Sequence, residues 1–232
     1  MSEIRVENII GETGTDAVKF TKGINATGIV TATSFAGSGA ALTGISAGNT
    51  NGMQVLEEFY VPCNGTAVTM AQGSVAIQNV TTAQVATDTM TDVTGSQITY
   101  QPPANTKLVI YTFSCMVDYT GGSGNGSIFG FQPYLDGVRL SSAPTSFRVN
   151  QYFMDFYHFV HGFRIESTAD ASIGQVTSWN STKTIKLQYR RWSNTFPGRI
   201  HGMGEGLRSS DGLFDNDVFR MPNVGIKAIG AV

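Results

Sequence analysis

Residues 107–119 read KLVIYTFSCMVDY, a run dominated by β-branched and aromatic side chains. Such residues suit the pleated surface of a β-strand, on which successive side chains point to opposite faces. Even-numbered positions from 108 to 114 therefore share one face, and odd-numbered positions from 109 to 115 share the other. Because both faces are largely apolar, we expect one to pack on the protein's own core and the other on a neighbouring subunit.

Similar runs flank this segment on both sides, separated by clusters of Gly, Ser and Asn, and no window shows a sustained helical period. The expected strands are 56–61, 73–80, 97–101, 107–119, 127–140, 150–166, 183–192 and 223–232. Asp136-Gly137 lies between apolar segments, which is a strong hairpin signal that requires positive φ at Gly137. The sequence therefore predicts an all-β, antiparallel fold.

Aromatic residues divide the chain near residue 52. Both Trp, all eight Tyr and twelve of the fourteen Phe follow this point, and only Phe20 and Phe35 precede it. Aromatic side chains supply large buried areas, so the compact core belongs to the second part. We predict a β-sandwich head over residues 53–232 and an N-terminal stalk over residues 1–52 that attaches it to other proteins.

The N-terminal segment holds strand-like pieces at 4–9, 17–20 and 28–35 but few apolar side chains. Pieces of this size are marginally stable alone, because ordering costs about 1–2 kcal/mol per residue. Three chains around a common axis would supply the missing core. The predicted packing row of such an intertwined β stalk is Ile29, Thr31, Thr33 and Phe35. This predicts a homotrimer, with a disordered tail as the alternative.

Charge and hydropathy exclude several partners. Charged residues make up 14% of the chain, the formal net charge is −2, and the 15 basic residues are scattered. Nucleic-acid binding needs clustered Lys and Arg, so we expect none. The opening MSEIRVENII has neither a basic nor an apolar signal region, and no apolar run reaches the ~18 residues that cross a bilayer, so we expect no membrane insertion.

Cys63 and Cys115 are the only cysteines, and each lies among apolar or β-favouring residues. Buried free thiols are therefore expected rather than a disulfide.

His158 and His161 have the spacing H-x-x-H, which occurs in some zinc sites. Positions three apart on a strand point to opposite faces, so we expect structural histidines and no bound metal or cofactor. Asp211, Asp215 and Asp217 gather three carboxylates in one loop, a calcium alternative whose spacing matches no EF-hand.

Arg191, Trp192 and Arg199 are the candidate surface patch of the head. Guanidinium groups stack on indole and pair with anionic groups, so the expected ligand is an anionic glycan of a host surface, with a host protein as the alternative. Arg190 and Arg191 alternate faces, so only one of the two contributes. No nucleophile and base are specified, and acids are sparse in the head. We therefore expect no enzyme, a glycan depolymerase being the less favoured alternative.

Residues 21–45, TKGINATGIVTATSFAGSGAALTGI, resemble a repeat-type segment of tail-fibre and other virion appendage proteins of marine phages, especially those of cyanobacteria. The opening SEIRVENIIGETGTDAVKFTKG is also similar to how such proteins begin. The resemblance implies a structural protein located in the virion. A short tail fibre or fibre-like appendage is the leading expectation, and a capsid-decoration or collar protein is the alternative.

The second part resembles, more loosely, the trimeric jelly-roll heads of the tumour-necrosis-factor and complement C1q type that also cap phage fibres. The segments that carry this likeness are 107–119, 134–137, 183–192 and the last apolar strand. The likeness implies a trimer and a jelly-roll fold rather than a ligand. Residues 193–222 depart from the pattern as a long, loop-like insertion.

Overall fold

In the computed structural model the chain divides into two units, residues Met1–Ile45 and Ser46–Val232. The structure describes residues 27, 52–120, 126–150, 154–203 and 218–231. The predicted stalk row, which is Ile29, Thr31, Thr33 and Phe35, lies outside the described residues. The fold is therefore that of the second unit.

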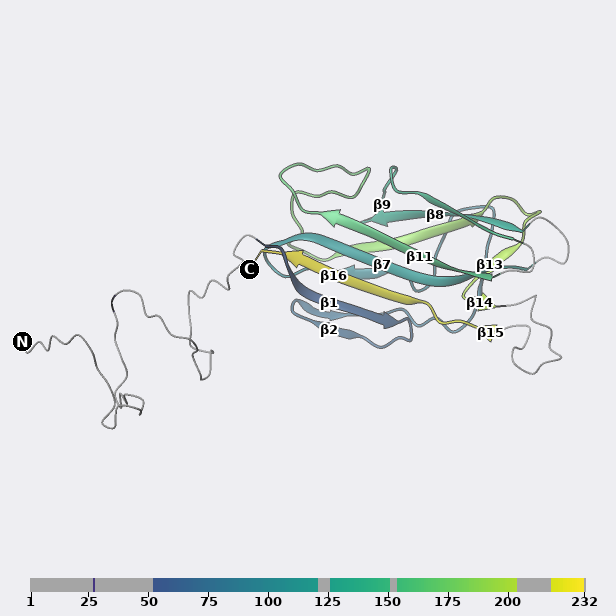
Figure 1. Cartoon of the computed structure of the whole chain (residues 1–232), viewed down its shortest axis with the longest axis horizontal. Helices are drawn as coiled ribbons and strands as arrows, with labels where there is room; N and C mark the ends of the chain where they lie inside the picture. The colour runs from purple at the N-terminus through teal and green to yellow at the C-terminus, as the bar shows by residue number, and fades with distance from the viewer. Residues whose placement is uncertain (1–26, 28–51, 121–125, 151–153, 204–217, 232) are drawn as a thin grey trace, which may run out of the picture. The chain divides into compact units, whose positions relative to one another are not determined.

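The described part of this unit is built from strands and contains no helix (Figure 1). The strands are β1 (Gln54–Pro62), β2 (Val68–Met70), β3 (Gly73–Val75), β4 (Gln84–Val85), β5 (Thr91–Asp92), β6 (Ile98–Tyr100), β7 (Thr106–Tyr119), β8 (Ser127–Leu135), β9 (Val138–Arg139), β10 (Thr145–Val149), β11 (Met154–Arg164), β12 (Lys183–Arg191), β13 (Gly198–Ile200), β14 (Gly202–Met203), β15 (Val218–Phe219) and β16 (Asn223–Gly230). Every pairing between these strands is antiparallel, as the sequence predicts.

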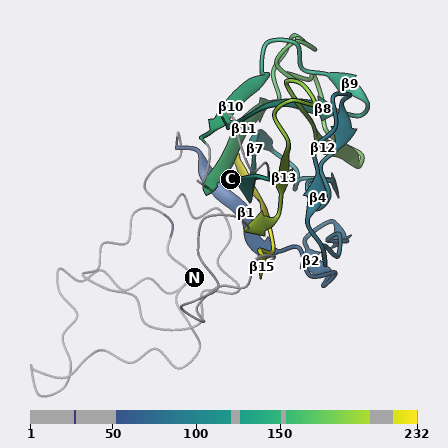
Figure 2. The ribbon, with the colours of Figure 1, turned by 90° about the vertical axis from the view of Figure 1, so that its right-hand side faces the viewer.

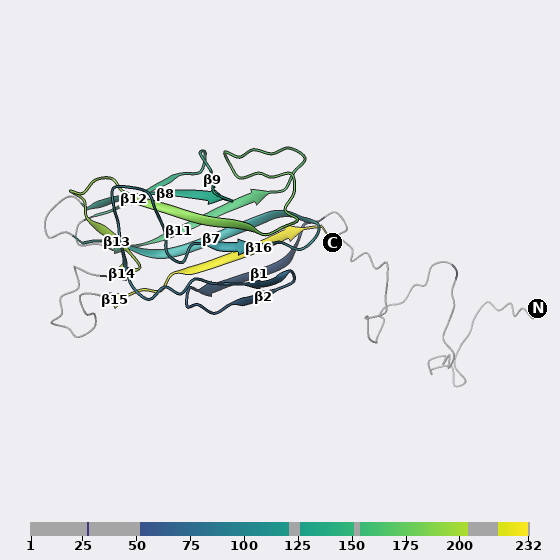
Figure 3. The same ribbon diagram turned by 180° about the vertical axis from the view of Figure 1, so that it is seen from behind.

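The first sheet is built around β7. Strand β11 follows one edge of β7, while β16 and β13 share the other edge, pairing with residues 106–114 and 117–119 respectively. Strand β1 extends the sheet beyond β16, and β4 extends it beyond β13. Gln54 at the start of β1 pairs with Gly230 at the end of β16, so the chain enters and leaves this unit at the same end (Figure 3).

The second sheet has β8 and β12 at its centre. Its order is β10-β8-β12-β5, with β6 also pairing with β12 and β9 with β8. Figure 2 shows β7 and β11 on one side of the unit and β8 and β12 on the other, so that the two sheets face each other.

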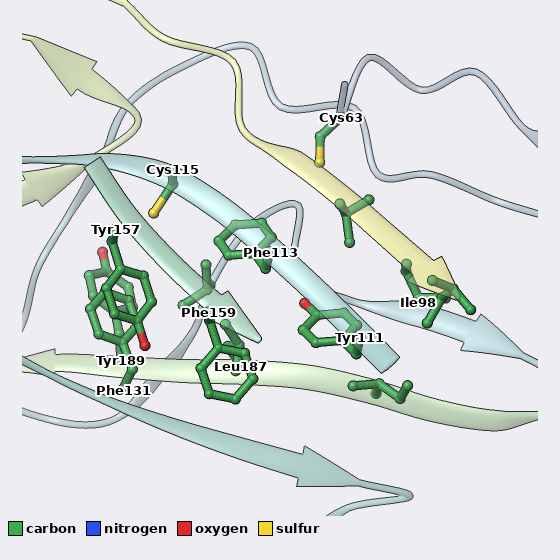
Figure 4. Packing of buried hydrophobic residues seen from close by; sticks show 14 of the residues in the cluster. Cys63, Ile98, Tyr111, Phe113, Cys115, Phe131, Tyr157, Phe159, Leu187 and Tyr189 are labelled. Carbon is green, nitrogen blue, oxygen red and sulfur yellow. The ribbon is translucent and has the colours of Figure 1, made fainter. Parts of the chain in front are cut away.

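The core lies between these sheets. The odd-numbered side chains of β7 from Val109 to Cys115 are buried and the even-numbered ones from Leu108 to Thr112 are half-buried, which confirms the predicted alternation. Phe131 of β8 stacks on Tyr157 of β11 with ring centroids 3.8 Å apart and planes 9° from parallel (Figure 4). Such stacking joins the two sheets and adds to the free energy gained from burial.

The predicted strand 127–140 is a hairpin of β8 and β9. Asp136 and Gly137 form its turn with φ of 50° and 78°. Positive φ at both turn positions matches the right-handed twist of the paired strands. The predicted reversal at Asp136-Gly137 is therefore confirmed.

The insertion expected to be loop-like, 193–222, contributes a strand to the first sheet, which corrects that expectation. Residues Gly198–Ile200 form β13 and pair with β7. A Cβ at position 198 would overlap the Phe129 ring and the Ser127 hydroxyl, so only glycine allows the chain to lie so close to β8.

Candidate functional site

A hollow of about 340 Å³ lies on the outward face of the second sheet. Its floor is Gly130 in the middle of β8, where an added Cβ would meet no atom within 4 Å. Gly130 is flanked by Ser146 of β10 and by Arg190 of β12, its partners in strand register. Because Phe129 and Phe131 on either side of Gly130 point into the core, the missing side chain leaves an open depression on the outward face. We call this depression the Gly130 hollow.

Trp192 forms one wall of the Gly130 hollow. Its backbone N–H donates to the carbonyl oxygen of Ile128 at 2.8 Å, which extends the pairing of β12 and β8 by one residue. Trp192 is 67% exposed. Ile128 and Met90 also line the hollow. A broad apolar ring is therefore presented to solvent at the edge of a concave surface.

Three arginines line the Gly130 hollow. Arg139 donates from Nε to the side-chain oxygen of the buried Gln132 at 2.8 Å, and Arg191 lies 2.7 Å from a carboxylate oxygen of Asp88. Among the residues that the structure describes, no carboxylate pairs with Arg190, whose side chain is exposed. The positive charges of Arg190 and Arg139 are therefore not neutralised by a carboxylate among the described residues.

The predicted patch is only partly brought together. Arg191 and Trp192 line the Gly130 hollow, but Arg199 lies in β13 of the other sheet. Arg199 Nε is 3.2 Å from Oδ2 of the buried Asp118, so its charge is engaged inside the protein. Arg199 therefore lies apart from Arg191 and Trp192, and a ligand-binding role for the patch stays a prediction.

Gly130, Arg139 and Ser146 were missed by the sequence interpretation. One local signal was present, because a glycine inside the apolar strand SIFGFQ marks either a close approach or a gap. Arg139 and Ser146 carry no such signal, since only strand pairing brings them beside β8.

The histidines of β11 lie on opposite faces, as predicted. His161 Nε2 is 2.8 Å from the carbonyl oxygen of Ile173, whereas His158 is exposed on the other face. Within the described residues no group of three His, Cys, Asp or Glu side chains is placed to hold a metal ion. Asp211, Asp215 and Asp217 lie outside the described residues.

His201 is a buried titratable group. Its Nε2 is 3.0 Å from the carbonyl oxygen of Thr94, so this nitrogen carries the hydrogen. Burial lowers the pKa of His201 to about 4, which leaves the ring neutral at pH 7. Its φ of 64° places it in the left-handed region.

Both cysteines are free and buried, as predicted. Burial raises the pKa of Cys63 to about 12, and burial likewise raises the pKa of Cys115. Neither thiol is a nucleophile at neutral pH, because the thiolate is the reactive form.

A second surface, on the outward face of the first sheet, carries exposed apolar side chains beside the Glu58–Lys227 ion pair and the exposed His158. Its most exposed apolar members are Val55 and Tyr60 of β1 and Phe156 and Val160 of β11, which are 46–53% exposed. We call these four residues the apolar face. The half-buried outward side chains of β7 lie between the two strands, since Phe156 and Val160 pair with positions 116 and 112. Apolar side chains thus occur on both edges of a four-strand surface.

The chain was compared with protein-family models and with curated proteins. The chain matches no protein-family model. No curated protein matches it in sequence. In the described part of the chain, no helix has the length and apolar character to cross a membrane.

Proposed function

We propose that the protein is a non-enzymatic, trimeric structural protein of a bacteriophage virion, a short tail fibre or fibre-like appendage that presents its head to the host surface. The apolar face of the first sheet is the observation that carries the trimer. The likeness of residues 21–45 to phage appendage proteins supports the location in the virion.

Strand order supports a jelly-roll head. Eight strands or strand positions follow one another along the chain: β1, β5 with β6, β7, β8, β10, β11, β12 and β16. The first, eighth, third and sixth of these form one sheet, and the second, seventh, fourth and fifth form the other. Two antiparallel sheets wound in this order are the arrangement of a jelly roll.

Burial supports further copies of the same chain as the occupants of the apolar face. Exposed apolar side chains that gather on one face can mark a protein–protein interface, and Phe156 and Val160 lie on the same outward face of β11 as the half-buried residues beside them on β7. The head also begins and ends at one end, through the Gln54 and Gly230 pair, so three heads can stand side by side with their N-terminal segments leaving together. A closed threefold ring satisfies both conditions.

Light scattering on the purified full-length chain tests the trimer, with three times the 24.8 kDa subunit mass expected. A monomer at micromolar concentration would contradict the proposal. Electron microscopy of particles labelled on this protein tests its location. Density at the tail is expected, whereas density on the capsid lattice would overturn the tail fibre in favour of a decoration protein.

A further inference from the structure

We propose that the Gly130 hollow binds a single acidic sugar ring, such as a uronic acid of a surface polysaccharide. The inference rests on the proposed function only for its biological role. All residues of the hollow belong to one subunit. The hollow lies on the outward face of the second sheet, whereas the apolar face lies on the outward face of the first sheet, so the proposed trimer leaves the hollow open.

Size favours a small ring. Ligand sites in proteins typically measure about 300–1,000 Å³, and the hollow, at about 340 Å³, is at the lower end. It accepts one ring over Gly130, where the structure leaves open space above the strand. Ser146 supplies a hydroxyl beside this space for hydrogen bonds to the ring's own hydroxyl groups.

Trp192 supplies a stacking surface. The face of an indole carries partial negative charge, and the C–H groups on one face of a pyranose carry partial positive charge, so the two surfaces attract. Stacking also removes apolar area from water, which favours binding where the ring is as exposed as Trp192.

Arg190 and Arg139 select an acidic ring over a neutral one. A guanidinium group matches a carboxylate with two parallel N–H donors. Arg139 is held toward the hollow by its bond to Gln132, and Arg190 has no carboxylate partner among the described residues. A neutral sugar has no carboxylate to pair with Arg190, so a neutral sugar is expected to bind with lower affinity than an acidic one.

A nucleic-acid strand fits less well. Such ligands need successive stacking surfaces along a continuous basic groove. Trp192 is the one exposed tryptophan, and the neighbouring cations Arg191 and Lys186 are neutralised by Asp88 and Asp92. The charge is therefore concentrated at one point rather than spread along a track.

Tryptophan fluorescence of the full-length protein measures binding. The chain has two tryptophans, and Trp179 is buried, so a change on titration reports Trp192. Methyl glucuronide is expected to saturate the signal with a Kd of about 1 mM, and methyl glucoside to bind at least about tenfold more weakly. Equal affinities, or no saturation by methyl glucuronide up to about 50 mM, would overturn the proposal.

Three variants locate the site. Gly130→Leu is expected to abolish binding, because an added Cβ at this position meets no atom within 4 Å and the leucine side chain would then occupy the hollow. Arg190→Gln is expected to weaken binding at least about tenfold. Arg164→Gln, the control, removes an exposed arginine of the other sheet and is expected to leave binding unchanged. Circular dichroism establishes that each variant is folded.

Binding that survives Gly130→Leu in the folded protein would overturn the proposal. So would an oligothymidylate that binds more tightly than methyl glucuronide and loses affinity in Arg190→Gln. Light scattering on the same samples separates the two proposals. A trimer without sugar binding contradicts only the sugar site, and a monomer that binds methyl glucuronide contradicts only the trimer.

Discussion

Arg199 of β13 and Asp118 of β7 are direct partners in strand register, and the guanidinium Nε lies 3.2 Å from the carboxylate Oδ2. The two side chains are 15% and 1% exposed, so the pair is nearly withdrawn from water. It joins the short strand β13 to the longest strand of the head. The attraction between two charges is stronger in such a site than at the surface.

Arg199→Gln is predicted to lower the free energy of unfolding by about 3 kcal/mol, because it removes the positive charge that lies 3.2 Å from the buried Asp118 carboxylate. Urea denaturation followed by tryptophan fluorescence measures the change. Arg164→Gln is the control, since its partner Glu166 and Arg164 itself are exposed, and a loss within about 0.5 kcal/mol is expected. Equal losses in the two variants would contradict the buried pair.

His201 is predicted to make the head less stable in mild acid. Its pKa is about 4 in the folded protein, below the 6.5 of the unfolded chain, because burial disfavours the charged ring. The unfolded state therefore binds the proton first as the pH falls through this window. Above pH 6.5 this destabilisation is absent, and by pH 4 it reaches about 3 kcal/mol.

Denaturation curves at several pH values test this prediction. His201→Asn is the informative variant, because asparagine tolerates the positive φ at this position but does not titrate. Its stability is expected to depend less on pH between 6.5 and 4 than that of the wild-type protein. An unchanged pH dependence would assign the effect to other groups.

Val160→Glu is predicted to convert the trimer into folded monomers. The substitution places a charge on the apolar face, where a packed neighbour would have to bury it. Val138→Glu is a matched control, because Val138 of β9 is 51% exposed and Val160 is 52% exposed, yet Val138 belongs to the other sheet. Light scattering is expected to give the mass of a monomer for Val160→Glu and the mass of a trimer for Val138→Glu. If both variants stay trimeric, the apolar face is not the interface.

Cys63 and Cys115 are predicted to resist thiol reagents in the native protein at pH 8. Both are buried, and burial raises the pKa of each, so the thiolate is scarce and inaccessible. Absorbance after addition of an aromatic disulfide reagent is expected to rise only when denaturant is present. Rapid labelling of one thiol without denaturant would show that its surroundings open readily.

Much of the fold was predictable from short-range patterns. The alternation in residues 107–119 indicates which side chains of β7 face the core, because a strand has a period of two whatever it pairs with. The turn at Asp136-Gly137 was equally predictable, since its positive φ depends on these two residues rather than on distant contacts.

Neighbours across the sheets depended on tertiary structure. Arg199 was predicted to lie beside Trp192, seven positions away, but strand pairing takes it to Asp118, 81 positions away. Gly130, Ser146 and Arg190 meet for the same reason, because β8 pairs with β10 on one side and β12 on the other. Periodicity in the sequence specifies the face of a strand on which a side chain lies. It does not specify the neighbouring strand, since that choice depends on how all the strands together bury their apolar faces and pair their backbone groups.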